Sequence, residues 1–304
     1  MIRFFLPVLV IVVSNVFYDI SAKLFPSDLN AQFGLMVVYT VGVVTSAVMF
    51  FITTKGKVSL RAELRKGNWL FIAYALCSMG IDFGYILLFR ADWNVSIGSL
   101  VCNILLAVSL LLIGVLFYKE KLGKTHFAGM FLCIAGLIGI NCQNEFSFGY
   151  FLPVIIVVVA NVLYDVVAKS VPEDINTFVG LMITHFTLII INGAIYFVGH
   201  GFSDVANQFS MVNWAVIAFA ITMVGLDAGY ILLYRAGWNI SLGTLVCNIS
   251  LAIAMLIIGG TAFNELVTWL QIVSVVVCAV GLVLISYMEI RIKTGEEEKI
   301  PDQA

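Results

Sequence analysis

Charge is scarce in this chain. Only 11% of its 304 residues are charged, whereas 62% are apolar and the mean hydropathy is +1.06. Soluble domains usually carry about 25% charged residues, so this composition excludes a soluble protein of this length. The formal net charge is −2 and no segment is dense in Lys and Arg, which excludes a nucleic-acid-binding surface. We therefore expect an integral membrane protein.

Residues that hold metals or perform catalysis are also few. The six cysteines lie in or beside apolar segments without CxxC spacing, which excludes a zinc site of the usual kind. The histidines, His126, His185 and His200, are scattered and have no histidine counterpart in the other half of the chain, Tyr39 standing where His185 would fall, so we assign them no role. Because no base, acid and metal come within reach of one another, we expect no cofactor and no enzymatic activity.

Long apolar segments predict an all-α fold. A helix needs about 20 residues to cross the hydrocarbon core of a bilayer. On this basis we expect ten transmembrane helices, at 3–25, 31–52, 68–90, 94–118, 124–142, 149–171, 177–199, 213–235, 239–263 and 267–288. The polar tail, 289–304, has no apolar segment and is expected to be solvated and cytoplasmic.

The chain contains an internal repeat. Residues 5–30 align without gaps on 151–176 with 15 of 26 identities, and 80–103 align on 225–248 with 17 of 24. The first five-helix repeat therefore spans 1–143 and the second spans 149–288. Copies with an odd number of spans lie upside down relative to each other in the membrane, which predicts two inverted repeats.

Basic residues support the inversion and give an orientation. If both termini lie on one side, that side receives 14 Lys and Arg and the other only two, Lys23 and Arg90. The loop 53–67 carries five Lys and Arg, whereas its counterpart 200–212 carries none. The positive-inside rule then predicts a multi-pass protein of the cell membrane with cytoplasmic N- and C-termini.

Several motifs occur once in each half. Ala22-Lys23 and Ala168-Lys169 close the first spans, glycines are spaced along the third and fourth spans, and Glu120 and Glu265 end the fourth spans. With ten spans in two halves, this ordered set resembles the drug/metabolite transporter superfamily and in particular its EamA-type members. The resemblance implies a cavity lined by the first, third and fourth spans of each half, and small-molecule substrates that are commonly exported.

Two acidic residues lie near the middle of the membrane. Asp82 and Asp227 occupy equivalent places in GIDFGY and GLDAGY, with Tyr85 and Tyr230 three residues later on nearly the same helical face. A charged side chain at this depth costs about 2.5 to 3.5 kcal/mol, so such residues usually serve function. We expect them to bind a cation or exchange protons; the alternative is a static bond to a neighbouring helix.

Four asparagines also repeat near mid-membrane. They are Asn15 and Asn161 in the first spans and Asn103 and Asn248 in the fourth spans. Their amides can bind a polar solute, and they can equally join one helix to another. With the Asp and Tyr pairs they form a candidate cavity lining.

Charged residues at the span ends form two further sets. Asp19, Lys23 and Arg90 are expected near the outer face, and Asp165, Lys169 and Arg235 near the inner face. We predict two matching gates; interface anchoring and helix capping are the alternative.

These patterns favour a secondary active transporter of an amine-like or zwitterionic solute, driven by a proton or substrate gradient, since no Walker-type phosphate loop is present. The expected partners are a small-molecule substrate, the lipid bilayer and protons, with the chain acting as a monomer or homodimer. A channel or facilitator is an alternative that inverted repeats also permit. An intramembrane lipid-modifying enzyme is a third class, for which the sequence offers no nucleophile motif.

Overall fold

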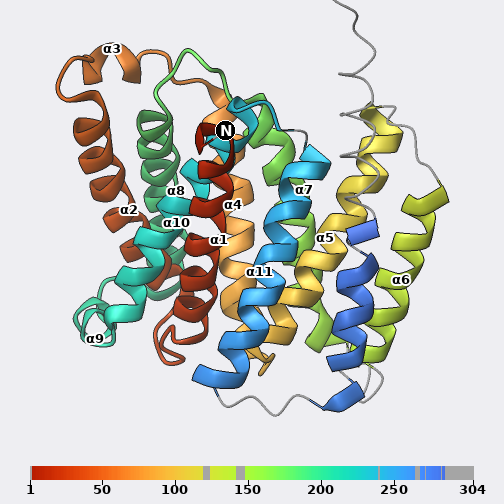
Figure 1. Cartoon of the computed structure of the whole chain (residues 1–304). Coiled ribbons are helices and arrows are strands. Elements are labelled where there is room, and N and C mark those ends of the chain that lie inside the picture. The colour runs from red at the N-terminus through yellow and green to blue at the C-terminus, as the bar shows by residue number, and fades with distance from the viewer. Residues whose placement is uncertain are drawn as a thin grey trace, which may run out of the picture.

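Helices form every element of the computed structural model within its described residues, which are 2–118, 124–141, 148–238, 240–263, 268–270, 272–281 and 283–284 (Figure 1). The long helices of the first half are α1 (Ile2–Lys23), α2 (Ala31–Thr54), α4 (Trp69–Arg90), α5 (Val95–Tyr118) and α6 (Lys124–Asn141). Those of the second half are α7 (Phe148–Ser170), α8 (Thr177–His200), α10 (Trp214–Arg235) and α11 (Ile240–Ala262). Two short helices, α3 (Leu60–Leu64) and α9 (Val205–Ser210), lie in the loops.

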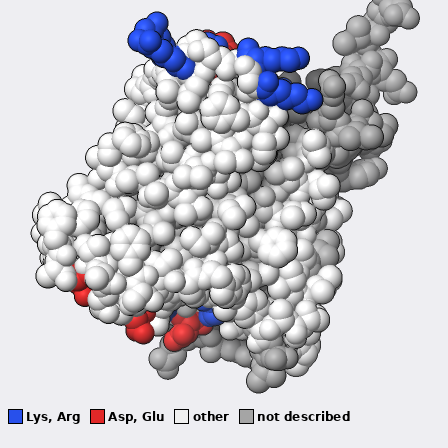
Figure 2. Space-filling model, turned by 90° about the vertical axis from the view of Figure 1, so that its left-hand side faces the viewer, with Lys and Arg blue, Asp and Glu red and all other residues white. Residues whose placement is uncertain are grey.

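The chain is a multi-pass membrane protein. Six of the described helices are long and apolar enough to cross a membrane, namely α1, α2, α4, α7, α8 and α10. Large apolar side chains such as Phe131 and Val198 are exposed on the flank of the molecule. Figure 2 shows this flank largely free of charge, with Lys and Arg mainly at the α3 end of the face in view and acidic side chains mainly at the opposite end. Such a belt suits the hydrocarbon core of a bilayer.

The helix boundaries agree closely with the expected spans. Asn30 and Asn176 begin α2 and α8, and their side-chain oxygens accept hydrogen bonds from the backbone N–H groups of the first turn. Asn68 and Asn213 do the same for α4 and α10. In the last expected span, 267–288, the described helix covers 272–281. The count of ten crossings remains a prediction, and the tail, 289–304, lies outside the described residues.

Helices of one half pair with helices of the other. The most extensive packing joins α1 to α10, α4 to α7, α2 to α8 and α5 to α11. Exchanging each helix for its repeat counterpart leaves this set of pairs unchanged, because α1 corresponds to α7 and α4 to α10. The two halves therefore share one interface. A site built on α1, α4, α7 and α10 draws residues from both halves.

The short helices were not expected from the sequence, and they join the halves at opposite ends of the molecule (Figure 1). In α3, the Glu63 Oε2 atom accepts a hydrogen bond from the backbone N–H of Asn176 at 2.7 Å. In α9, the Gln208 Oε1 atom accepts one from Asn30 at 2.8 Å. Glu63 and Gln208 are repeat counterparts, 145 positions apart, and Asn30 and Asn176 are counterparts, 146 positions apart. Each half thus holds the start of a long helix in the other.

Candidate solute-binding cavity

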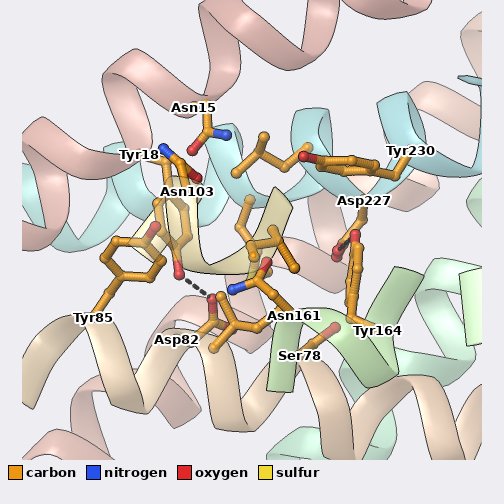
Figure 3. Close-up of a pocket in the computed structure, with 14 residues that line it drawn as sticks. Asn15, Tyr18, Ser78, Asp82, Tyr85, Asn103, Asn161, Tyr164, Asp227 and Tyr230 are labelled. Carbon is orange, nitrogen blue, oxygen red and sulfur yellow. Dashed lines mark hydrogen bonds between the residues drawn. The ribbon is translucent and has the colours of Figure 1, made fainter. Parts of the chain in front are cut away.

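A small cavity lies between the two halves and is lined by polar side chains (Figure 3). Its volume is about 40 Å³, enough for about two or three water molecules. Seven of the eight residues expected to bind solute line it: Asn15, Asp82, Tyr85, Asn103, Asn161, Asp227 and Tyr230. The eighth, Asn248, lies beside it, where its Nδ2 atom donates to the backbone oxygen of Asn103 at 3.3 Å. The lining contains no Lys or Arg among the described residues.

Glycines set how closely the helices around this cavity approach. Adding a Cβ atom to Gly84 would bring it within 2.7 Å of Val157, so α4 and α7 touch at this level. A Cβ atom on Gly229 would come within 2.6 Å of Ile11, so α10 and α1 touch at the equivalent level. The glycines therefore allow the close helix packing that small residues give in membranes. Asp82 and Asp227, two residues before each of these glycines, project into the space between the four helices.

Asp82 is held by two phenol groups. The Tyr18 hydroxyl donates to Oδ1 at 2.6 Å, and the Tyr39 hydroxyl donates to Oδ2 at 2.8 Å. The Asp82 residue is 2% exposed. Both donors are neutral groups, so they stabilise the carboxylate by hydrogen bonding and leave its charge uncompensated.

Asp227 has a different set of partners. The Tyr164 hydroxyl donates to Oδ1 at 2.7 Å, as its counterpart Tyr18 does to Asp82. Tyr74 donates to the same oxygen at 3.2 Å and also bonds to the Tyr164 hydroxyl. The Nε2 atom of His185 lies 3.1 Å from Oδ2. Asp227 therefore has a titratable imidazole beside it, which Asp82 lacks.

Aromatic rings form matching walls on the two sides of the cavity. Tyr85 meets Tyr18 edge to face at 5.5 Å and 87°, and Tyr230 meets Tyr164 at 5.7 Å and 87°. Tyrosine rings at such a site can contact a cation through their faces. The walls thus suit a small cationic or amphipathic solute.

The residues expected to form gates lie at opposite ends of the molecule. The Arg90 Nη2 atom donates to the backbone oxygens of Pro26 and Leu29 at 3.0 and 2.6 Å, and Arg235 does the same to Pro172 and Ile175 at 2.6 and 3.0 Å. Each arginine therefore ties down the loop after the first helix of its half. Lys23 donates to the backbone oxygen of Trp93 at 2.9 Å. Lys169 is exposed and has an electrostatic or hydrogen-bonding partner of its own.

The acidic members of the gate sets are buried and differ from each other. The Tyr234 hydroxyl donates to Asp165 at 2.7 Å, and the Thr244 hydroxyl lies 3.5 Å from its other oxygen. Asp19 is fully buried, and neither of its carboxylate oxygens has a hydrogen-bond partner in the part of the chain that the structure describes. Phe89 occupies the place of Tyr234 in the first half, so one donor is missing there.

Five residues that bond to the two carboxylates were not predicted from the sequence: Tyr18, Tyr39, Tyr74, Tyr164 and His185. A signal existed for Tyr18 and Tyr164, because both belong to the repeated Asn-Val-x-Tyr-Asp segment. His185 received no role because it breaks the repeat, yet it contacts Asp227. In the described residues, no three His, Cys, Asp or Glu side chains cluster in a way that could hold a metal ion.

The first half of the chain is similar to a known protein family. Residues 4–142 match the profile of the EamA-like transporter family. The first half of the chain is therefore similar to the EamA-like transporters. The match ends where the first repeat ends, and the second half is linked to it by the repeat itself. The similarity is to transporters of small solutes in the drug/metabolite transporter superfamily, and it favours a non-enzymatic role.

A likeness of fold to a solved structure extends over nearly the whole chain. A solved structure, described only as a crystal structure of a protein, is similar with a TM-score of 0.62 and 14% sequence identity, covering 94% of this chain and 97% of the other. At this identity the likeness concerns the fold alone. Comparison with curated proteins gives no significant match.

Proposed function

We propose that this protein is a secondary active transporter that moves a small organic cation or zwitterion by alternating access between two inverted five-helix repeats. The observation that carries the proposal is the pair Asp82 and Asp227, two buried carboxylates that face one cavity at the interface of the halves. Keeping one such group within the membrane costs about 2.5 to 3.5 kcal/mol on insertion scales, and this chain keeps two.

The distribution of charge around the cavity supports a cationic or zwitterionic solute. The lining contributes two carboxylates and, within the described residues, no lysine or arginine. An ammonium group entering the cavity would meet the carboxylates and the faces of Tyr85 and Tyr230. An organic anion would meet uncompensated negative charge, which disfavours it. Export across the cell membrane is the direction we propose, with a proton gradient as the driving force.

The contacts between the two halves at opposite ends of the molecule support inverted repeats. The loop after α1 contacts α9 at one end, whereas the equivalent loop after α7 contacts α3 at the other. Basic residues gather at the α3 end, including Lys55, Lys57 and Arg61 in the loop that contains α3. We place this end and both termini in the cytoplasm on that basis.

The small volume of the cavity fits an intermediate of a transport cycle. A space of about 40 Å³ is too small to hold an organic solute, and a cavity of this size is not an open pore. Movement of one repeat against the other would widen the cavity toward one side at a time. This favours a carrier over a permanently open channel.

Counterflow in proteoliposomes tests the proposal. Vesicles loaded with unlabelled tetramethylammonium, or in parallel with a zwitterionic amino acid, receive the radiolabelled compound outside. A carrier gives label uptake that saturates with concentration and depends on unlabelled solute inside, and Asp82→Asn should abolish it. Linear flux without dependence on internal solute would instead support a channel, and absence of flux for every cationic or zwitterionic compound would overturn the proposal.

A further inference from the structure

The two carboxylate sites differ more than the halves around them. Tyr39 donates to Asp82 where its counterpart His185 contacts Asp227. Tyr74 donates to Asp227, whereas its counterpart, Phe219, stacks on Tyr18 at 4.4 Å and offers no hydroxyl to Asp82. A duplicated scaffold thus holds one carboxylate among neutral phenols and the other beside an imidazole.

The imidazole of His185 is placed to take up a second proton. The residue is fully buried, its Nε2 atom lies 3.1 Å from Asp227, and its Nδ1 atom lies 3.5 Å from the Ser46 hydroxyl. With Nε2–H directed at the carboxylate, Nδ1 is the nitrogen that gains or loses the proton, and the serine hydroxyl can rotate to serve either state. A Cβ atom on Gly42 would come within 3.1 Å of Nδ1, so this glycine leaves room for the ring.

The groups that face His185 come from three helices. Helix α2 contributes Tyr39, whose ring is parallel to the imidazole at 6.2 Å, and Ser46. Helix α10 contributes Asp227, and α4 contributes Tyr74 through its bond to that carboxylate. The fourth element that packs on α8 is α3, whose Glu63 bonds to Lys66 and to Asn176, before the first turn of α8. Within the described residues, Asp227 is therefore the one acidic group in direct contact with the imidazole.

We propose that the Asp227–His185 pair is the proton-exchange site of this transporter and that Asp82, with Tyr18 and Tyr39, is the anchor for the cationic group of the solute. This division of roles rests on the proposed function. With the imidazole protonated, the pair is neutral and the cavity carries only the charge of Asp82. Loss of that proton to the aqueous phase gives the cavity a second negative charge. A solute cation near both groups favours the deprotonated state, so solute and proton compete.

The protonation part can be tested without any solute. The full chain in lipid nanodiscs is labelled with ¹⁵N at the histidine rings, of which it has three, and His185→Gln identifies the His185 signal. The glutamine amide can still donate to Asp227 but does not titrate. We expect the ring signals of His185 to report exchange of one proton over the range pH 5 to pH 8. Asp227→Asn should change this response strongly, because it removes the carboxylate that contacts the imidazole, and Asp82→Asn should change it much less.

Two results would overturn this part. One is an imidazole that stays in a single protonation state from pH 5 to pH 8. The other is an equal change from both carboxamide variants, because it would mean that Asp227 has no special link to His185. Tyr39→His is the reciprocal control, since it places an imidazole beside Asp82 and should add a fourth titrating signal that responds to Asp82→Asn.

The anchoring part is tested with tetramethylammonium, which carries no exchangeable proton. Its addition to wild-type protein in weak buffer near pH 6.5 should release protons, all of which come from the protein. His185→Gln should bind the ion but release no protons, whereas Asp82→Asn should lose at least tenfold in affinity. Equal binding by Asp82→Asn would overturn the anchor. Failure of the wild type to bind any cation would overturn both the anchor and the proposed function, while the titration of His185 would still be decided separately.

Discussion

Cys133 and Cys278 donate their thiols to each other's backbone oxygens, at 3.7 Å from Cys133 and 3.5 Å from Cys278. The two residues are 145 positions apart, the same offset that relates Asp82 to Asp227. A reciprocal contact between repeat counterparts is what a twofold axis produces. The contact of Asn248 with Asn103 has the same offset. These pairs mark a line of pseudo-symmetry between the halves.

The close helix contact at these cysteines predicts an effect on stability. A Cβ atom on Gly281 would come within 2.7 Å of the backbone oxygen of Gly129, and one on Gly136 would overlap Cys278. We expect Gly136→Ala and Gly281→Ala each to destabilise the protein by about 1 to 3 kcal/mol through overpacking. The control is Gly199→Ala, where no atom lies within 4 Å of the added methyl group. Thermal unfolding in detergent measures all three, and equal melting temperatures would contradict this packing.

The unpaired carboxylate of Asp19 gives a second prediction. Tyr234→Phe removes the hydroxyl that donates to Asp165 at 2.7 Å and should destabilise the protein by about 1 to 3 kcal/mol. Phe89→Tyr introduces the matching hydroxyl in the first half, and we expect it to stabilise the protein by providing Asp19 with a donor. Thermal unfolding compares the two variants directly, because Tyr234→Phe removes the hydroxyl group and Phe89→Tyr introduces it. A Phe89→Tyr variant that melts below wild type would show that the halves are not equivalent at this position.

The expected gates predict opposite effects at the two sides of the membrane. Arg90→Gln loses the bonds to Pro26 and Leu29 and should loosen the outer end, whereas Arg235→Gln should loosen the cytoplasmic end. The assay is labelling of Ile81→Cys in the cavity by a membrane-impermeant maleimide, with the native cysteines replaced by alanine. We expect several-fold faster labelling from the outside for Arg90→Gln and from the inside for Arg235→Gln. Unchanged labelling and transport in both variants would leave the arginines as loop anchors only.

The contact between α3 and the loop before α8 should depend on pH. The Lys66 ammonium, which lies 2.6 Å from Glu63, and the Asn176 N–H lower the pKa of the Glu63 carboxyl below its ordinary value. A lowered acid pKa contributes stability that is complete above the ordinary value near 4.5 and is lost as the pH falls through the folded-state pKa. Because the Lys66 side chain is 37% exposed, we expect this ion pair to contribute less than about 1 kcal/mol to the free energy of unfolding.

Glu63→Gln tests this contact with a control built into the chain. The amide oxygen can still accept from Asn176, as Gln208 accepts from Asn30. Thermal unfolding should therefore be nearly unchanged at pH 7, and the loss of stability between pH 5 and pH 3 should be smaller than in wild type. An acid-induced loss as large as that of wild type would show that Glu63 does not contribute to it.

The sequence predicted the long helices that the structure describes and most of the polar residues that line the cavity, because both follow from local signals that occur twice. Asparagine caps and arginines at helix ends mark the boundaries, and the repeat singled out Asp82 and Asp227. The short helices α3 and α9 were missed because they form in polar loops, and their contacts with Asn176 and Asn30 exist only after the halves assemble.

His185 was missed for the opposite reason. Selecting residues by repeat equivalence keeps what is shared and discards what differs, and His185 is the substitution that makes the two carboxylate sites different. Its contact with Asp227 joins residues 42 positions apart on two helices, α8 and α10, and no spacing rule within one helix could have suggested it.

Binding of tetramethylammonium by calorimetry tests the central claim most directly, with wild-type protein compared with Asp82→Asn, Asp227→Asn and the surface control Asp204→Asn. We predict binding by wild type and by Asp204→Asn, at least tenfold weaker binding by Asp82→Asn, which corresponds to about 1.4 kcal/mol, and weaker binding without pH dependence by Asp227→Asn. Binding that is equally strong in all four proteins, or that occurs only with neutral and anionic compounds, would contradict a cation site at the paired carboxylates.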